Sequence, residues 1–210
     1  MTKDIEPREL GFPVVFEGEF DFNQEAILKK MYEKIETKSF VQNYEGGKKQ
    51  GAYQLEVGDA GSTAGLQADP PHTWPELQRF NMYVERQAKK IFETWGLPYK
   101  GKGAVIDSSW FNRHGQGGMT NYHVHAGGDL VLAAYIKAEP NSGDLLMVDP
   151  MEYHWFHAKS MRLRDMLEGQ KFTAATNKVY FFAPFLRHAT EPNNSGEDRF
   201  VISYNIACMR

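Results

Sequence analysis

Cysteine is nearly absent from this sequence, because Cys208 is the single one among 210 residues. One cysteine cannot close an internal disulfide, and it cannot supply the set of thiolates that a zinc site or an iron–sulfur cluster requires. The sequence therefore excludes a disulfide-stabilised scaffold and thiolate metal chemistry, and it fits a reducing compartment best.

Long apolar runs are absent as well, since no stretch approaches the roughly 18 apolar residues needed to span a bilayer. Residues 1–10, MTKDIEPREL, have no apolar core like that of a secretory signal peptide. We therefore expect a cytoplasmic protein with no membrane partner.

An excess of charge of either sign is missing too. Charged residues make up 24% of the chain, and the formal net charge is only −3 at pH 7. No strong electrostatic field therefore draws the protein toward a polyanion. This balance argues against nucleic acid as a partner.

The composition that remains is that of a protein with one sizeable core. Hydrophobic residues make up 41% of the chain and aromatic residues 13%, which suits a single buried core with a helical annex. We expect one domain over residues 1–210, in which residues 1–103 supply a strand and helical support. Residues 104–210 would form a jelly-roll core, interrupted by a polar insertion at residues 151–173.

The N-terminal half begins with a strand-like segment and an amphipathic helix. Residues 12–22 mix β-branched and aromatic residues and predict an edge strand. Residues 24–36 carry apolar side chains at helical spacing and predict a helix with one buried face. Residues 42–71 are rich in glycine and polar residues, so they predict a long loop.

A second and longer helix is predicted to begin at Thr73. Pro75 would lie in its first turn, and Glu76 would complete a capping box with Thr73. Apolar residues continue at helical spacing as far as Trp95, and Gly96 then ends the helix. We expect this helix to pack across a sheet.

The periodicity changes after the second helix. Short strand-like runs, separated by Gly, Asn and Pro turns, occupy residues 104–113, 129–137, 144–148, 178–182 and 199–207. Helices followed by short antiparallel strands indicate the α+β class, here a double-stranded β-helix, or jelly-roll (cupin-like) barrel, braced by the N-terminal helices. Small barrels of this kind enclose room for one small ligand.

Three histidines on the predicted strands offer a metal site. His123 and His125 are two residues apart, so on a strand both imidazoles point to the same side. Such a pair also occurs without metal, when the rings face solvent or form hydrogen bonds. His188 follows the apolar run of residues 181–185, where a polar imidazole needs a partner. Two neighbouring ligands and a distant third would leave positions on a metal open for substrate and oxygen.

Arg199 begins a strand-like run in which it shares one face with Ser203. Inside a barrel, a guanidinium and a hydroxyl on one face would bind a carboxylate through charge-assisted hydrogen bonds. Alternatively, Arg199 pairs with Asp198 or Glu197 on the surface. Tyr135 could add a phenol to the same carboxylate, or it could be a core aromatic residue.

Together these segments resemble the iron(II)- and 2-oxoglutarate-dependent oxygenase superfamily, and within it a branch with an HxH motif found in marine bacteria and phages. The resemblance covers residues 104–207 and rests on SSWFN at 108–112, HVH at 123–125, a glycine-led strand at 143–150, and His188 followed by Arg199, Ser203 and Asn205. It implies Fe(II) held by the first and last of the three histidines, His123 and His188. It also implies 2-oxoglutarate as cosubstrate, with its distal carboxylate at Arg199 and Ser203. Tyr135 and the motif residue Asn205 are further candidates for the cosubstrate site.

One position departs from the pattern of the superfamily. Most members have His-x-Asp or His-x-Glu, whereas His125 occupies the carboxylate position in this sequence. Three neutral imidazoles would leave the full dipositive charge on the metal, which favours an anionic cosubstrate. Either His125 is the ligand, as we expect, or Asp129 takes its place.

The resemblance implies a dioxygenase that hydroxylates a protein side chain, in the manner of a prolyl hydroxylase, or a small metabolite, with oxygen as the second cosubstrate. The residues expected to shape the substrate pocket are Trp110, Asn112, His114, His154 and Trp155. One alternative is a three-histidine cupin-type dioxygenase or isomerase that does not use 2-oxoglutarate. Another is a non-enzymatic β-sandwich interaction module of the phage type, in which the histidines are incidental.

Overall fold

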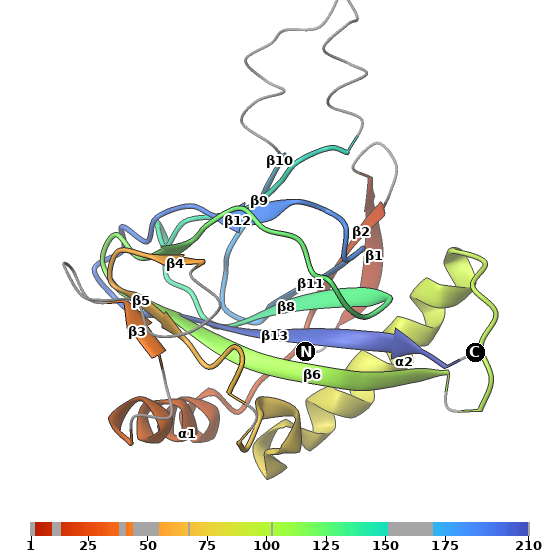
Figure 1. Cartoon of the computed structure of the whole chain (residues 1–210), viewed down its shortest axis with the longest axis horizontal. Helices are drawn as coiled ribbons and strands as arrows, with labels where there is room; N and C mark the ends of the chain where they lie inside the picture. Colours follow the sequence, from red (N-terminus) through yellow and green to blue (C-terminus); the bar gives the residue numbers. More distant parts are fainter. Residues whose placement is uncertain are drawn as a thin grey trace, which may run out of the picture.

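The computed structural model describes residues 3–9, 14–37, 41–43, 55–66, 68–101, 103–150 and 170–209. The fold has two sheets that face each other and two helices that lie outside the larger sheet (Figure 1). None of the helices in this part of the chain combines the length and the apolarity that crossing a membrane requires.

The larger sheet is antiparallel throughout. In spatial order its strands are β1 (Lys3–Glu9), β2 (Val14–Glu19), β11 (Lys178–Phe182), β8 (Leu130–Lys137), β13 (Arg199–Cys208), β6 (Ala104–His114), β5 (Ala60–Ser62) and β3 (Val41–Asn43). The central strand β13 pairs with β8 on one side and with β6 on the other. These three strands carry much of the pocket described below.

The smaller sheet faces the larger one. Its strands are, in spatial order, β10 (Gln170–Phe172), β9 (Leu145–Met147) and β12 (His188–Thr190), and beside it β4 (Glu56–Val57) pairs with β7 (Met119–Thr120). This two-sheet arrangement with flanking helices is the α+β double-stranded β-helix that the sequence predicted.

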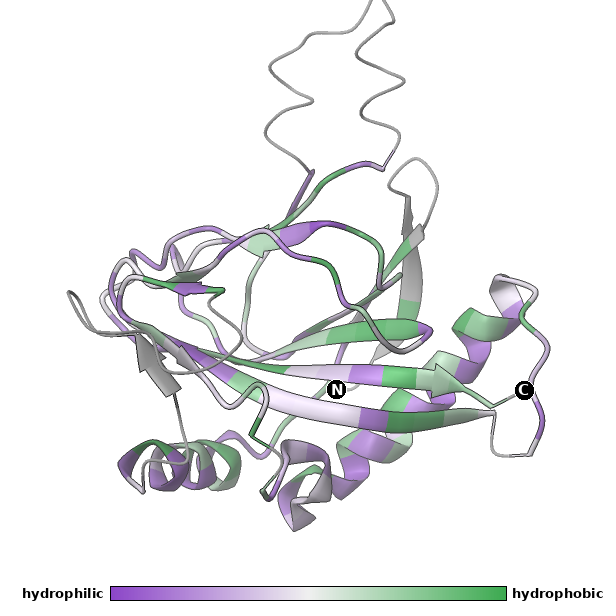
Figure 2. Ribbon diagram, viewed as in Figure 1, coloured by the Kyte–Doolittle hydropathy of each residue, from purple (hydrophilic) through white to green (hydrophobic). Residues whose placement is uncertain are grey.

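Two helices cover the outer face of the larger sheet: α1 (Gln24–Glu36) and α2 (Gln78–Thr94) (Figure 1). The bounds of α1 agree with the sequence prediction, and its buried residues Ile27 and Met31 belong to the predicted apolar face. In Figure 2, both helices alternate between hydrophobic and hydrophilic residues, whereas β8 is hydrophobic along most of its length. This contrast is expected, because helices have one solvent face while a central strand is buried on both sides.

Strand β8 separates two hydrophobic cores. Its residues Leu132 and Ala134 face the helices, whereas Val131, Ala133 and Tyr135 face the smaller sheet. Successive side chains of a strand point to opposite faces, so a continuous apolar run fills both cores. Tyr135 therefore lies between the sheets, on the face that the pocket occupies.

Strand β13 has the alternation that the sequence predicted. Phe200, Ile202 and Tyr204 pack in the core under the helices. Val201 and Ser203 instead face the space between the two sheets.

The predicted start of the second helix is wrong. Two 3₁₀ turns, η1 (Pro71–Thr73) and η2 (Pro75–Leu77), precede α2, which begins at Gln78. Trp74 between the turns is extended, at φ −73° and ψ 134°, because a proline at the next position disfavours the helical region. The hydroxyl of Thr73 consequently donates to the carbonyl of Pro70 at 2.8 Å and caps no helix.

Two further predictions about the N-terminal half need correction. Strand β2 is not an edge strand, because β1 pairs with its outer side. Residues 42–71 are not one long loop, because their described part contains β4 and β5, and β3 begins at Val41. These strands have only two or three residues each, which is too short for a period-two pattern to emerge from a glycine-rich segment.

Candidate metal and cosubstrate site

The three histidines of the predicted metal site come from two hydrogen-bonded segments. The N–H of His123 donates to the carbonyl of His188 at 2.9 Å, and the N–H of His188 donates back to His123 at 3.0 Å. The N–H of His125 donates to the carbonyl of Pro184 at 2.9 Å. This pairing brings residues that are about sixty positions apart in sequence into direct contact.

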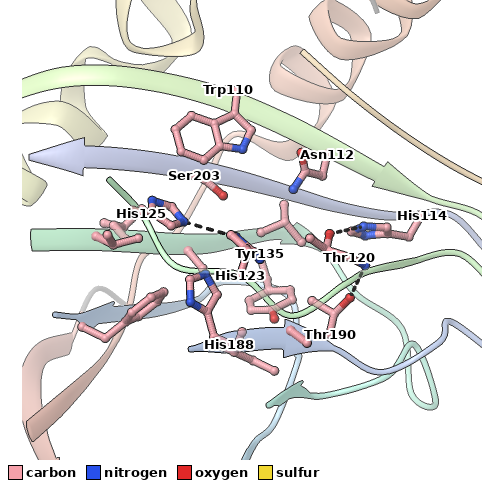
Figure 3. Close-up of a pocket in the computed structure, with 17 residues that line it drawn as sticks. Trp110, Asn112, His114, Thr120, His123, His125, Tyr135, His188, Thr190 and Ser203 are labelled. Atoms are coloured by element: carbon pink, nitrogen blue, oxygen red, sulfur yellow. Dashed lines mark hydrogen bonds between the residues drawn. The ribbon is translucent and has the colours of Figure 1, made fainter. Parts of the chain in front are cut away.

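The alternation predicted for the HxH motif is present, although this segment forms an isolated bridge rather than a strand. Tyr122 and Val124 are 40% and 54% exposed, whereas His123 and His125 turn inward. The nitrogen ligand atoms of the two histidines and of His188 all lie within 4.8 Å of one another (Figure 3). The structure therefore brings together the three imidazoles that the sequence singled out.

The hydrogen bonds of the three rings fix their tautomers. Each Nδ1 lies next to an oxygen that only accepts: the carbonyl of Asn121 at 2.9 Å for His123, Oδ1 of Asn205 at 2.7 Å for His125, and the carbonyl of Leu186 at 2.8 Å for His188. Each Nδ1 must therefore carry the proton, and each Nε2 keeps its lone pair. This is the outer-shell pattern that orients histidines bound to metals.

The free lone pairs face one another. The Nε2 atoms of His123 and His125 are 3.3 Å apart, and neither neutral ring has a proton to share there. Three acceptors around one point are an unfavourable arrangement until a cation or a donor lies between them. Imidazole nitrogens suit divalent iron, zinc, copper and nickel, so this donor set fits the iron that the resemblance implies.

Burial keeps the three imidazoles neutral. It lowers the pKa of His123, lowers the pKa of His125 to about 4, and lowers the pKa of His188 well below its ordinary value. The neighbouring rings add to the effect for His125 and His188, because each disfavours a second positive charge. Neutral imidazole is the form that binds a metal, so the site needs no deprotonation at pH 7.

These pKa values predict that the metal-free protein loses stability in acid. Below pH 6.5 the unfolded histidines take up protons, whereas the folded ones stay neutral, so the free energy of unfolding falls as pH decreases from 6.5 toward 4. The slope is about 1.4 kcal/mol per pH unit for each such histidine. Chemical denaturation at pH 7.5, 6.0 and 5.0 measures it, and His125→Asn should give a shallower slope. An equal slope in that variant would contradict the assignment.

Asp129, the alternative to His125, lies outside the histidine cluster. One carboxylate oxygen accepts the backbone N–H of Cys208 at 2.8 Å, and the N–H of Asp129 donates to the carbonyl of Ile206. The side chain thus holds the end of β13. The structure gives the position near the other two imidazoles to His125.

A pocket lies between the sheets beside the cluster. Of the predicted site residues, those that line it together with the three histidines are Trp110, Asn112, His114, Tyr135 and Ser203 (Figure 3). Pairing of adjacent strands brings these side chains together. Ser203 of β13 lies opposite Trp110 of β6, and Val201 of β13 lies opposite Tyr135 of β8.

Trp110 and Asn112 lie on the β6 wall of this pocket. The ring centroid of Trp110 is 5.4 Å from that of His125. The hydroxyl of Ser62 donates to Oδ1 of Asn112 at 2.6 Å, which leaves the amide nitrogen directed into the pocket (Figure 3). A hydrogen-bond donor and an aromatic ring are thereby available in the pocket that the three histidines line.

Two predicted site residues have a different place from the one expected. Asn205 does not line the pocket; its amide accepts from His125 and donates to Ser108 at 3.0 Å. His114 lines the pocket but is fully buried, and its Nε2 lies 2.8 Å from the carboxylate of Glu56. Both residues therefore hold other side chains in position.

Arg199 is fully buried at the end of the pocket, so the alternative of a surface ion pair is wrong. Asp198 pairs with Arg113 at 2.7 Å, and Glu197 pairs with Lys137 at 3.1 Å. The guanidinium of Arg199 instead donates to Nδ1 of His114, to the carbonyls of Ser142, Gly143 and Glu191, and to Oγ1 of Thr190. Burial lowers the pKa of Arg199.

Tyr135 is a buried phenol with an unused hydroxyl. Its side chain is 0% exposed, and its hydroxyl has no hydrogen-bond partner in the described part of the chain. Burial raises its pKa to about 12, so it remains a donor at neutral pH. A buried donor without a partner is unfavourable by about 1–3 kcal/mol, and an anionic ligand in the pocket would satisfy it.

Sequence reasoning missed Glu56, Thr120 and Thr190. The carboxylate of Glu56, 9% exposed, accepts from His114 and from the hydroxyl of Thr120 at 3.0 Å. Oγ1 of Thr190 accepts the N–H of Thr120 and an N–H of Arg199, each at 2.9 Å. No spacing pattern marks these residues, and only the pairing of β4 with β7 brings Glu56 to Thr120.

Two of the predicted substrate-pocket residues, His154 and Trp155, lie outside the described residues, as does most of the predicted insertion 151–173. At the described end of that insertion, residues 170–173, Gln170–Phe172 form β10 and pair with β9.

Comparison with known proteins agrees with this geometry. Residues 108–205 match a protein family described as "Putative 2OG-Fe(II) oxygenase". None of the curated proteins matches the sequence. The matched range contains the three histidines, Tyr135, Arg199 and Ser203.

Solved structures share the fold at low sequence identity. A Pseudomonas putida prolyl-4-hydroxylase is 10% identical with a TM-score of 0.58, covering 93% of this chain and 92% of that chain. The epimerase SnoN from nogalamycin biosynthesis is 11% identical with a TM-score of 0.60, covering 92% and 78%. HygX from Streptomyces hygroscopicus, solved with nickel and 2-oxoglutarate, is 10% identical with a TM-score of 0.53, covering 92% and 82%. The family match over residues 108–205 identifies this segment as 2OG-Fe(II) oxygenase-like, and that family implies Fe(II) and 2-oxoglutarate, while the solved structures show the same fold.

Proposed function

We propose that this protein is an Fe(II)- and 2-oxoglutarate-dependent dioxygenase in which His123, His125 and His188 hold the iron. The observation that supports this most directly is the convergence of three Nε2 lone pairs within 4.8 Å, each fixed by an Nδ1–H bond behind it. When bound, iron and 2-oxoglutarate supply oxygen activation and the oxidation of a substrate C–H bond. The protein supplies position, charge and the pocket.

The side chains at the buried end of the pocket suit the distal carboxylate of 2-oxoglutarate. Tyr135 offers an unused hydroxyl with the positive charge of Arg199 behind it, and Ser203 offers a second hydroxyl farther along β13, opposite Trp110. Three neutral imidazoles at the other end leave the charge of a divalent metal uncompensated, which favours a dianionic chelator. We assign these three residues to the cosubstrate, while Asn205 orients His125.

For the substrate, we propose a protein side chain, with a prolyl residue as the first candidate. The support is the likeness to the Pseudomonas putida prolyl-4-hydroxylase, which extends over 92% of that chain. A small metabolite is the second candidate, supported by the likeness to the nogalamycin epimerase. Trp110 and Asn112 adjoin the metal ligands and would contact either substrate.

Binding measurements test this function. We expect 2-oxoglutarate to bind the Ni(II)-loaded protein at least tenfold more tightly than the metal-free protein, because it chelates the metal, and we expect the iron-loaded enzyme to release succinate. Isothermal calorimetry and succinate assays measure both. Metal binding with no effect of 2-oxoglutarate would favour the three-histidine enzyme that does not use this cosubstrate. Absence of metal binding would overturn the proposal.

A further inference from the structure

The hydroxyl of Thr190 can form one further hydrogen bond, as a donor. Thr190 ends β12, two residues after His188, and its side chain lines the pocket (Figure 3). Its oxygen accepts the backbone N–H of Thr120 and the Nη2–H of Arg199, each at 2.9 Å. A hydroxyl has two lone pairs and one proton, so both lone pairs are occupied and the proton remains for donation. The described part of the chain provides no acceptor for that proton.

Arg199 does not itself line the pocket. Its Nη1 donates to the carbonyls of Ser142 and Gly143, and its Nε donates to His114. Thr190 is the pocket-lining side chain to which the guanidinium donates through Nη2. A hydroxyl that accepts from a cation is polarised and becomes a stronger donor. Arg199 therefore acts on the pocket indirectly, by making the Thr190 hydroxyl a stronger hydrogen-bond donor.

Arg199 also contacts His114, which in turn contacts Glu56. The Nδ1 atom of His114 accepts from its Nε at 3.3 Å, and the other ring nitrogen of His114 lies 2.8 Å from the carboxylate of Glu56. The same carboxylate accepts from Thr120, whose backbone N–H donates to Thr190. These bonds form a closed network that fixes the oxygen of Thr190 and leaves only its proton unassigned.

We propose that Thr190 binds the cosubstrate by donating a hydrogen bond to its distal carboxylate. This inference rests on the proposed function and adds a residue to it. Thr190 and Tyr135 then form a pair of hydroxyl donors at the end of the pocket nearest Arg199, and Thr190 differs from Tyr135 because it accepts from the guanidinium of Arg199 (Figure 3).

The test compares two ligands and two variants of Thr190. Thr190→Val keeps the shape and removes the hydroxyl, while Thr190→Ser keeps the hydroxyl and is the matched control. Both are titrated by calorimetry, in the Ni(II)-loaded form, with 2-oxoglutarate and with oxalate, which chelates the metal but has no distal carboxylate. We expect Thr190→Val to bind 2-oxoglutarate about tenfold more weakly, to bind oxalate within twofold of the wild type, and Thr190→Ser to restore 2-oxoglutarate binding.

The outcomes separate this inference from the function on which it rests. If the wild-type protein binds oxalate but not 2-oxoglutarate, the proposed function fails. If the wild-type protein binds both ligands and Thr190→Val binds 2-oxoglutarate equally well, the role of Thr190 is overturned. Equal losses for both ligands would show general damage to the site and would overturn it too. Should Thr190→Val not fold, Thr190→Cys, a weak donor that still accepts, replaces it with the same expected results.

Discussion

Replacing His188 with alanine is expected to lower the affinity of the protein for Ni(II) or Fe(II) by at least about 100-fold. His188 is 6% exposed, and its Nδ1 is fixed by the carbonyl of Leu186, so its Nε2 has one direction available. The two remaining imidazoles, both from one short segment, would bind the metal with two ligands in place of three. The measurement is metal content after dialysis, followed by competition with a chelator of known affinity.

The matched control for this prediction is His72→Ala. His72 is also partly buried, and its ring bonds to the hydroxyl of Ser109 at 2.7 Å on the opposite face of β6 from the pocket. This variant is expected to retain the metal affinity of the wild type. If His188→Ala retained one equivalent of metal under the same conditions, the three-histidine site would be wrong. If both variants lost metal, general instability would be the cause.

The structure also shows why some of the site could be predicted from sequence. Period-two alternation predicted that Ser203 lies on the pocket face of β13. It also predicted that His123 and His125 point to the same side, and both line the pocket although their segment forms no regular strand. Alternation depends only on an extended backbone, so it survives irregular pairing. The apolar run before His188 indicated that this imidazole needs a partner, but which partner it meets depends on a long-range contact.

The polar network around Arg199 depends on partners that carry no sequence signal. Arg199 donates mainly to backbone carbonyls, which every residue possesses. Glu56 belongs to a two-residue strand in a glycine-rich segment, and its role follows from its contact with His114. Capping at Thr73 was predicted from a local motif, and the extended residue before Pro75 overrode it. Local patterns thus predicted the strand faces, whereas tertiary contacts decided the polar network.

Arg199→Ala is expected to lower the free energy of unfolding of the metal-free protein by about 3–5 kcal/mol, because it leaves a buried network without its cation. The carbonyls of Ser142 and Gly143 would lose their donor, and the carboxylate of Glu56 would stay buried beside a neutral histidine. Chemical denaturation measures the change. The matched control is Arg113→Ala, since Arg113 pairs with two partly exposed aspartates and is expected to contribute about 1 kcal/mol.

Arg199→Lys distinguishes the structural from the binding role of this residue. Lysine keeps the positive charge but has three donors at one point, so it cannot reach the backbone carbonyls and Thr190 at the same time. We expect a folded protein that binds Ni(II) as the wild type does and binds 2-oxoglutarate at least about tenfold more weakly. Wild-type affinity for 2-oxoglutarate in this variant would show that the cosubstrate does not depend on the guanidinium. Its oxalate affinity should remain unchanged, because oxalate does not extend to this end of the pocket.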